Sequence, residues 1–369
     1  MQLSRIHRSH PAVLLFEGYL AAVGLGTALL LLPWSSADGA LSLVDAIFTA
    51  TSAICVTGLI VVDTGSRFTA FGQGVILCMI QIGGLGIMTV SVVLFRLVRR
   101  RIGFRHRMAV QELFSHTPRT DIYQLLGSIV VFTVVAEGIG TLLFLAHWWQ
   151  EMPFPRALAM AGFHAVSAFC NAGFSLLSTS FTAYRDSLLL NATACALIIL
   201  GGLGFPVVYE LWSLARKRAG RRIRMSVQTR AVLLTSGVLV VAGTAVFLVT
   251  GGEAMGKDGT AGRVLASLFQ SVTCRTAGFN TVEVGALNPT VLAFMIFLMF
   301  FGASPGSCGG GVKTTTLAVL AAFSLSRLRG RIRVNMFYKS VPYDTVTKCV
   351  TVTLLSVALI SSALFLLLW

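Results

Sequence analysis

The stretch from Phe48 to Leu59 reads Phe-Thr-Ala-Thr-Ser-Ala-Ile-Cys-Val-Thr-Gly-Leu, with a long apolar segment before it and another after it. It is too short to cross a bilayer, because a spanning helix needs roughly 20 apolar residues. A helix begins near Asp45 and breaks at Thr57-Gly58, where glycine adopts backbone angles that other residues resist. The stretch therefore predicts a hairpin that enters the membrane as a short helix and ends in a loop.

The same design recurs twice more along the chain. The second copy, Phe163 to Phe174, reads Phe-His-Ala-Val-Ser-Ala-Phe-Cys-Asn-Ala-Gly-Phe, and the third, Leu268 to Phe279, reads Leu-Phe-Gln-Ser-Val-Thr-Cys-Arg-Thr-Ala-Gly-Phe. The three glycines, Gly58, Gly173 and Gly278, follow one another at intervals of roughly 105–115 residues, and apolar helices flank every copy. This pattern is typical of an internally repeated membrane protein.

Composition supports the same class. Apolar residues make up 55% of the chain and charged residues 12%, with a mean hydropathy of +0.82, whereas a soluble domain has about 25% charged residues. The net charge of +15 does not indicate nucleic-acid binding, because the basic residues lie in short runs directly after apolar spans and form no basic-aromatic module. The seven cysteines are scattered and predict neither disulfides nor a zinc site.

We therefore predict an all-α polytopic membrane protein built from repeated units of outer helix, re-entrant loop and inner helix. The expected spans are 12–32, 74–98, 122–148, 187–214, 231–250, a broken segment at 290–326, and 348–369. The expected units are 1–110, 111–225, 226–335 with its inner helix broken at 301–316, and 336–369, the last holding only the first helix of a fourth unit.

Charge predicts the orientation. Most basic residues lie in the N-terminus and in the loops after each second span, so these parts are expected on the cytoplasmic side of the plasma membrane. The opposite side carries more acidic than basic residues, which raises the local concentration of cations.

Three hairpins at equivalent places can surround one axis with their backbone carbonyls, and rings of carbonyls replace the hydration shell of a monovalent cation. Re-entrant packing loops of another kind of transporter are the alternative. Because catalysis needs one constellation and not three copies of a loop, an enzyme using His164, Cys170 or Lys313 is a weaker interpretation, and we expect no catalytic residues. An alternating-access cation carrier, sodium-coupled or sodium-selective, stays open as a second interpretation.

The motifs Cys-Val-Thr-Gly-Leu, Phe-Cys-Asn-Ala-Gly-Phe and Thr-Cys-Arg-Thr-Ala-Gly-Phe-Asn-Thr resemble the filter segments of the Trk/Ktr/HKT potassium transporters, and the resemblance covers nearly the whole chain. It implies a pseudo-fourfold, channel-like architecture that takes up potassium, with no covalent cofactor. A glycine in the first filter implies potassium, whereas serine there implies a preference for sodium. The potassium-coordinating filter would be formed by the backbone carbonyls of Val56, Thr57, Gly58, Asn171, Ala172, Gly173, Thr276, Ala277 and Gly278.

The third inner segment cannot be a regular helix, because proline and several glycines interrupt it. A nucleotide-binding P-loop requires Gly followed at once by Lys, whereas Val312 separates Gly311 from Lys313. The resemblance instead implies an intramembrane gating loop under the filter, with Lys313 as a positive charge on the conduction path. A lysine that snorkels to the membrane interface is the alternative. The residues of this loop are Gly302, Ser304, Pro305, Gly306, Gly309, Gly310, Gly311 and Lys313.

The resemblance also implies partners. These are a cytoplasmic nucleotide-binding regulatory ring of the RCK type, through which a nucleotide would act, and a homodimer whose formation a missing fourth unit puts in doubt. A fourth filter glycine is expected near 383–393, beyond Trp369. Two further charges are of interest. We expect Arg275 to hydrogen-bond loop carbonyls from behind, and Glu137 to pair with a loop amide or a pore cation.

Overall fold

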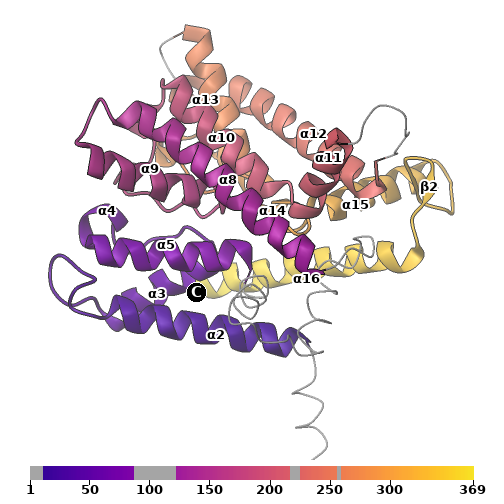
Figure 1. The fold of residues 1–369 in the computed structure, drawn as a ribbon. Helices are drawn as coiled ribbons and strands as arrows, with labels where there is room; N and C mark the ends of the chain where they lie inside the picture. Colours follow the sequence, from indigo (N-terminus) through magenta and orange to yellow (C-terminus); the bar gives the residue numbers. More distant parts are fainter. Residues whose placement is uncertain (1–10, 87–121, 217–224, 256–258) are drawn as a thin grey trace, which may run out of the picture.

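The computed structural model describes residues 11–86, 122–216, 225–255 and 259–369, and Figure 1 shows them as a bundle of helices that follow one another from the first unit (indigo) to the third (orange). The first unit consists of α2 (Pro11–Leu30), α3 (Leu43–Ile54), the short α4 (Thr64–Arg67) and α5 (Ala70–Leu85). α3 packs against both α2 and α5. The Ser42 hydroxyl caps α3 by accepting a hydrogen bond from the Asp45 N–H. Residues 87–98 of the predicted inner span lie outside the described residues.

The second unit consists of α8 (Ile122–Trp148), α9 (Phe154–Phe169), η1 (Thr182–Tyr184), α10 (Leu188–Gly202) and α11 (Phe205–Arg216). The apolar segment predicted at 187–214 is broken, because α10 and α11 are bent by 100° at their junction. Pro206 lacks the N–H that a continuous helix would use, and Gly204 adopts a left-handed φ of 88°. The sequence signal for this break, Gly-Phe-Pro at 204–206, resembles that of the third unit but is shorter.

The third unit consists of α12 (Val227–Thr250), η2 (Gly252–Met255), α13 (Gly259–Thr273), η3 (Val284–Ala286), α14 (Pro289–Phe300) and α15 (Thr314–Leu328). A small antiparallel hairpin follows, β1 (Asn335–Met336) and β2 (Lys339–Ser340), with Met336 opposite Lys339. Its turn residues, Phe337 and Tyr338, both have positive φ, as a tight two-residue hairpin turn requires. This hairpin was not predicted from the sequence. The last helix, α16 (Tyr343–Leu368), packs on α15.

Among the described residues, three helices are long and apolar enough to cross a membrane: Gly127–Trp148, Val227–Thr250 and Tyr343–Leu368. The bent pair α10 and α11 passes the same test as one broken span. α16 is entirely unburied over its most apolar window, as expected of a helix that faces lipid or another protein. The fold is therefore the predicted all-α, polytopic architecture.

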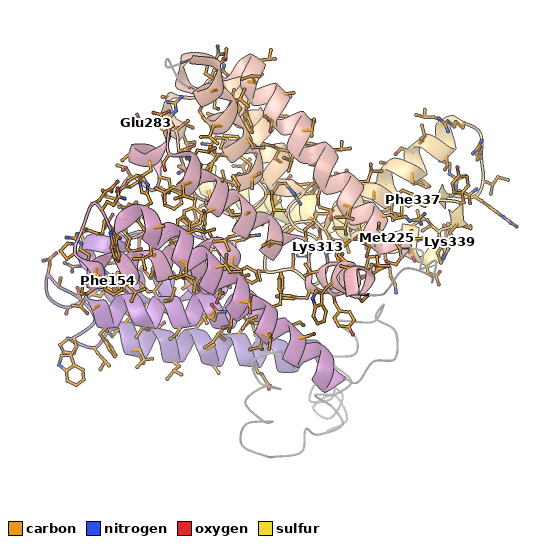
Figure 2. The ribbon with its side chains drawn as sticks, turned by 45° about the horizontal axis from the view of Figure 1, so that its top comes forward. Phe154, Met225, Glu283, Lys313, Phe337 and Lys339 are labelled. Atoms are coloured by element: carbon orange, nitrogen blue, oxygen red, sulfur yellow. The ribbon has the colours of Figure 1, made fainter. Side chains whose placement is uncertain are left out.

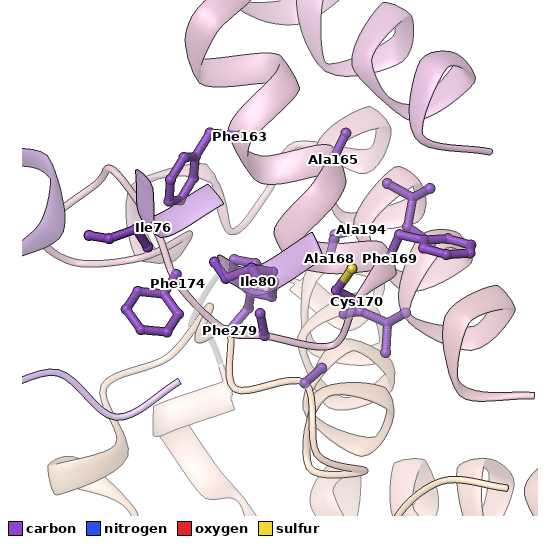
Figure 3. Packing of buried hydrophobic residues seen from close by; sticks show 14 of the residues in the cluster. Ile76, Ile80, Phe163, Ala165, Ala168, Phe169, Cys170, Phe174, Ala194 and Phe279 are labelled. Carbon is purple, nitrogen blue, oxygen red and sulfur yellow. The ribbon is translucent and has the colours of Figure 1, made fainter. Parts of the chain in front are cut away.

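Successive units pack on one another through two helix pairs. The inner helix of one unit contacts the short helix of the next, α5 on α9 and α10 on α13. The main hydrophobic core lies along these contacts, and Figure 3 shows Phe174 and Phe279, which follow two of the repeated glycines, in the same cluster as Ile76 and Ile80 of α5. The core thus positions the loops that end α3, α9 and α13.

Candidate functional site

The loops that follow α3, α9 and α13 share one unusual backbone pattern. Val56, Asn171 and Thr276 have left-handed φ values of 55°, 56° and 71°, and the glycine two residues later, Gly58, Gly173 or Gly278, is left-handed as well, at 82°, 71° and 86°. A left-handed conformation costs a residue with a Cβ roughly 1–2 kcal/mol, and it is a genuine outlier for β-branched valine and threonine. Strained backbone conformations are concentrated at functional sites, so three copies of the same strained conformation indicate a shared functional role.

The three loops converge at one place. A Cβ added to Gly58 would lie 2.5 Å from the Ala172 carbonyl oxygen, and one added to Gly173 would lie 2.7 Å from the Ala277 carbonyl oxygen. A Cβ on Gly278 would lie 3.2 Å from the Cα of Gly173. The structure therefore brings all three predicted glycines together, with backbone carbonyls between them and no room for side chains.

A side-chain hydroxyl stabilises each loop at the same point. Ser52 donates to the Leu59 carbonyl at 2.7 Å, Ser167 to the Phe174 carbonyl at 2.7 Å, and Thr273 to the Phe279 carbonyl at 2.8 Å. Each acceptor belongs to the residue that directly follows the repeated glycine. These hydroxyls were not predicted from the sequence, although one stands six residues before the glycine in the first two copies and five residues before it in the third. We call Ser52, Ser167 and Thr273 the clamp hydroxyls.

The first two loops also close the ends of their helices in the same way. The Thr57 N–H donates to the Ser52 carbonyl at 2.8 Å, and the Ala172 N–H donates to the Ser167 carbonyl at 2.8 Å. Inside each of these bonds lies a second one that spans fewer residues, from the Val56 N–H to the Ala53 carbonyl and from the Asn171 N–H to the Ala168 carbonyl. Together they form the usual motif that ends a helix with a left-handed residue. The third loop has Arg275 where the first two have a cysteine, and there both the Ala277 N–H, at 2.9 Å, and the Gly278 N–H, at 3.4 Å, donate to the Thr273 carbonyl. Backbone N–H groups of all three loops thus donate to carbonyl oxygens in the last turns of the preceding helices.

A cavity of about 920 Å³ opens directly onto the three glycines. Gly58, Gly173 and Gly278 all line it, together with the segments that follow the second and third loops. The charged residues in its wall are Arg185 and Glu283. Figure 2 places Glu283 and Phe154 on one side of the molecule, and Met225, Phe337 and Lys339 on the other.

The break between α14 and α15 spans residues 301–313, which we call the glycine-rich loop. It is compact, because Ala303 donates to the Gly310 carbonyl at 3.1 Å and the Val312 N–H donates to the Phe300 carbonyl at 2.9 Å. The hydroxyls of Ser304 and Thr314, at 2.9 Å, join its two ends. Gly306 and Gly311 have the positive φ values, 69° and 75°, that let the chain turn so tightly.

The glycine-rich loop docks on the bend between α10 and α11. The Ser304 N–H donates to the Gly202 carbonyl at 3.0 Å, and the Cys308 N–H donates to the Gly201 carbonyl at 3.1 Å. In the opposite direction, the Phe205 N–H donates to the Gly306 carbonyl at 2.9 Å. The break in the second unit thus supplies backbone partners to the break in the third. This contact was not predicted from the sequence.

The same loop lies against two of the three convergent loops. A Cβ added to Gly309 would lie 2.9 Å from the Asn171 side-chain amide and 2.8 Å from the Thr276 hydroxyl. The Lys313 ammonium donates to the Gly309 carbonyl at 2.9 Å, and Figure 2 shows Lys313 between the two sides of the molecule. The Lys313 ammonium is therefore held by a carbonyl oxygen of the glycine-rich loop itself.

The expectation for Arg275 was wrong. Its Nη2 donates to the Ser236 hydroxyl of α12 at 3.0 Å, and it makes no bond to a loop carbonyl among the described residues. Glu137 on α8 is buried beside the Gln81 side chain of α5, and its Oε1 has no hydrogen-bond partner in the described part of the chain.

The candidate catalytic histidine is a packing residue. His164 is fully buried among Trp148, Phe181 and Phe279. Its Nδ1 lies 2.8 Å from the Met160 carbonyl oxygen and its Nε2 lies 2.9 Å from the Ser175 hydroxyl. Both ring nitrogens are therefore engaged. Within the described ranges, no group of three or more potential ligands could hold a metal ion through side chains.

Repeated units with convergent strained loops and a broken inner helix define a channel-like membrane transport protein, and comparisons with known proteins agree. The family described as "TrkH: Cation transport protein" matches residues 16–369. The chain therefore belongs to this cation transport family. It is 39% identical over 360 residues to the Ktr system potassium uptake protein B of Vibrio alginolyticus, covering 97% of this chain and 78% of that one.

Two further relatives frame the comparison. The potassium/sodium uptake protein NtpJ of Enterococcus hirae is 32% identical over 355 residues, covering 95% of this chain and 78% of that one. The crystal structure of the potassium transporter TrkH from Vibrio parahaemolyticus matches with a TM-score of 0.67 at 19% identity, covering 90% of this chain and 67% of that one. At this identity the structural match concerns the fold alone.

Proposed function

We propose that this chain is the ion-conducting subunit of a potassium uptake system in the bacterial plasma membrane. The observation that carries the proposal is the convergence of Gly58, Gly173 and Gly278 in three loops of like backbone conformation. Two of its relatives are named as potassium uptake proteins. The transported ion moves down its electrochemical gradient, and no covalent chemistry is involved.

In this proposal the residues at 56–58, 171–173 and 276–278 form a selectivity filter. Alternating left-handed residues turn neighbouring carbonyls toward one side, so that each loop offers several oxygens to a dehydrated cation. The helices α3, α9 and α13 direct their negative C-terminal ends toward the same point, which favours a cation further. The cavity of about 920 Å³ is the outer vestibule.

The glycine-rich loop is the gate. It lies against Asn171 and Thr276 on the side of the filter away from the vestibule, and Lys313 adds a positive charge that opposes a passing cation. The basic ends of the spans, with the N-terminus, face the cytoplasm. There an RCK-type nucleotide-binding ring would regulate the gate, and a second copy of the chain would complete a homodimer.

A sodium-dependent variant of the function is the second candidate, because one relative is named a potassium/sodium uptake protein. Gly58 favours potassium, since a glycine leaves the carbonyl path unobstructed whereas a serine adds a side chain. Competition between rubidium and sodium in an uptake assay separates the two candidates.

Potassium-limited growth of an uptake-deficient bacterial host tests the proposal. We expect the chain to rescue growth and Gly278→Ala to abolish the rescue, because a methyl group at a φ of 86° would meet the backbone of Gly173. The matched control is Gly162→Ala in α9, where an added Cβ meets nothing within 4 Å. Equal growth of the two variants, at equal amounts in the membrane, would refute the filter.

A further inference from the structure

A surface of exposed arginines and exposed apolar side chains lies where α15 and α16 meet, at the β-hairpin end of the molecule (Figure 1). Residues 327–343, which we call the arginine segment, read Arg-Leu-Arg-Gly-Arg-Ile-Arg-Val-Asn-Met-Phe-Tyr-Lys-Ser-Val-Pro-Tyr and contain no acidic residue. Leu328 is 85% exposed, Ile332 is 84% exposed, and Tyr338 is fully exposed. Large apolar side chains that gather on a surface mark a site of interaction with a protein or a membrane.

The arginine segment is folded, because backbone hydrogen bonds fix both of its turns. Gly330, at a left-handed φ of 68°, ends α15, and the Arg331 N–H donates across it to the Ser326 carbonyl at 2.9 Å. The Val341 N–H donates to the Val334 carbonyl at 2.8 Å and closes the hairpin of β1 and β2. The fold therefore sets where the side chains of this segment lie.

The hairpin is held alongside the two helices. Val334 is buried in a small apolar cluster with Val319 of α15 and Val346 of α16. Met336 of β1 and Val341 pack on the same cluster. The arginine segment therefore lies beside the ends of α15 and α16 and does not project away from them.

Three charges of the segment have no protein partner. Arg329, Arg331 and Arg333 are exposed, and none of them forms an ion pair within the described part of the chain. Arg327 differs, because its guanidinium lies 5.2 Å from the centre of the Phe323 ring. Three neighbouring positive charges are thus available to a ligand.

The residues of α16 indicate where this surface stands relative to a bilayer. Its charged residues, Asp344 and Lys348, lie in the first two turns, and no charged residue follows up to Trp369. From Val352 onward its large apolar side chains are exposed, so the hydrocarbon region begins near that residue and Lys348 lies at the interface. The hairpin packs on Val346, at the level of Lys348. The arginine segment therefore lies at the membrane surface.

We propose that the arginine segment binds anionic phospholipids of the adjoining leaflet. The headgroup phosphates lie at Arg329, Arg331 and Arg333, and the Ile332 and Tyr338 side chains insert among the lipids beneath them. Basic clusters directly beside a spanning helix attract anionic lipid, and aromatic and apolar side chains gather at the same depth. A zwitterionic lipid offers the same acyl chains but no net negative charge, so it lacks most of this attraction.

Two observations favour lipid over an acidic protein as the partner. The hairpin is packed back on α15 and α16 at the depth of the interface, and exposed apolar side chains stand between its arginines. Lys339 is not part of the lipid site. It stands opposite Met336, and directly opposed residues share a face of the hairpin, which here is the face packed on the helices.

The arginine segment is connected to the glycine-rich loop through α15, and this part of the inference rests on the proposed function. α15 begins at Thr314, whose hydroxyl lies 2.9 Å from that of Ser304 in the glycine-rich loop, and it ends at Leu328 in the arginine segment. In this structure the loop lies against Asn171 and Thr276. Lipid bound to the arginine segment holds the far end of α15 in this position, so it favours the closed gate.

Hydrogen–deuterium exchange of the full chain in nanodiscs tests the binding. Peptides from residues 329–341 should exchange about fivefold more slowly in phosphatidylglycerol than in phosphatidylcholine, the effect of one basic side chain at the headgroups. Residues 33–42 include the exposed Trp34 but no basic residue, and they should exchange alike in both lipids. Equal exchange of residues 329–341 in the two lipids would overturn the proposal and leave the arginines to an acidic protein.

A matched pair of variants localises the site. Arg331→Gln removes one of the three charges and should lower the preference for phosphatidylglycerol about fivefold, read from the lipid fraction that gives half of the protection. Arg156→Gln removes an exposed arginine at the start of α9, outside the arginine segment, and should leave that fraction unchanged. Because both side chains are exposed, neither change should unfold the protein. Equal shifts in the two variants would refute the site.

The connection to the gate has its own measurement. In liposomes, rubidium uptake by the wild-type chain should fall as phosphatidylglycerol replaces phosphatidylcholine, and uptake by Arg331→Gln should fall only at a higher fraction of phosphatidylglycerol. If exchange behaves as expected while uptake is unchanged or rises, the connection through α15 is wrong and the lipid site stands. If neither chain takes up rubidium in either lipid, the proposed function fails, and the exchange result still decides the site.

Discussion

The hydroxyl of Ser167 donates a hydrogen bond of 2.7 Å to the carbonyl oxygen of Phe174, and the same bond is made by Ser52 to Leu59 and by Thr273 to Phe279. Each bond closes a loop around one of the convergent glycines. Because the donor belongs to the helix and the acceptor to the residue after the glycine, the bond fixes the height of the loop relative to the helix end. The clamp hydroxyls therefore set the positions of the carbonyls that the proposed filter uses.

Removal of a clamp hydroxyl should loosen the filter without unfolding the protein. A buried hydrogen bond contributes about 1 kcal/mol, so we expect Ser167→Ala to reduce the preference for potassium over sodium by about fivefold. Rubidium uptake in the presence of increasing sodium measures this preference. Thr141→Ala removes a comparable bond, to the Glu137 carbonyl at 2.8 Å within α8, and should leave the preference unchanged. An equal loss in both variants would contradict a role for the clamp.

Substitution of the first glycine should change the ion that is preferred. Gly58 has a φ of 82° and lies against the Ala172 carbonyl, so Gly58→Ser adds both backbone strain and a side chain on the carbonyl path. We expect lower uptake of rubidium and a relative gain for sodium, measured as competition between the two ions. Gly162→Ser, at an open position of α9, is the control. Unchanged selectivity in Gly58→Ser would favour a carrier over a filter.

Neutralisation of Lys313 should open the proposed gate. Its ammonium lies 2.9 Å from the carbonyl oxygen of Gly309, which adjoins the second and third convergent loops, and two like charges repel strongly where water is scarce. We expect Lys313→Gln to raise rubidium uptake several-fold at equal expression. Lys339→Gln removes a charge from the distant β-hairpin and should have no effect. An unchanged flux in Lys313→Gln would mean that the lysine does not face the ion path.

Two buried thiols report on the contact between the proposed gate and the proposed filter. Cys170 ends α9 at the second convergent loop and Cys308 lies in the glycine-rich loop, with the two side chains beside each other. We expect copper phenanthroline to join them in a disulfide, detected as a loss of two alkylatable thiols, and uptake to fall until a reductant is added. Neither change should occur in Cys308→Ser. Retention of both thiols at full uptake would place the two loops further apart than the structure does.

Much of the architecture follows from the sequence because it repeats. The apolar spans predicted the membrane fold, and three copies of one motif placed Gly58, Gly173 and Gly278 at equivalent positions. Periodicity could not reveal the bend between α10 and α11, because Gly204 and Pro206 interrupt a segment that is apolar on both sides of the break. The clamp hydroxyls could not be predicted for a different reason. A serine or threonine in a short helix looks the same in the sequence whether its hydroxyl bonds a carbonyl of its own helix or a carbonyl of the following loop.

The contacts between units were the least predictable part. Bonds such as Ser304 to Gly202 and Phe205 to Gly306 join backbone atoms about a hundred residues apart, and backbone bonds leave no residue-type signal. Arg275 was misjudged for a related reason, since nothing in the sequence shows that Ser236 of α12 lies within its reach.

The most direct test of the central claim is to locate a bound ion. A crystal of the full chain grown in rubidium chloride and measured at the rubidium absorption edge would show the ion by its anomalous scattering. The proposed filter predicts a peak among the carbonyl oxygens of Thr57, Ala172 and Ala277, lost when sodium replaces rubidium. A rubidium peak found only elsewhere, with the three loops empty, would contradict the claim that these loops select the ion.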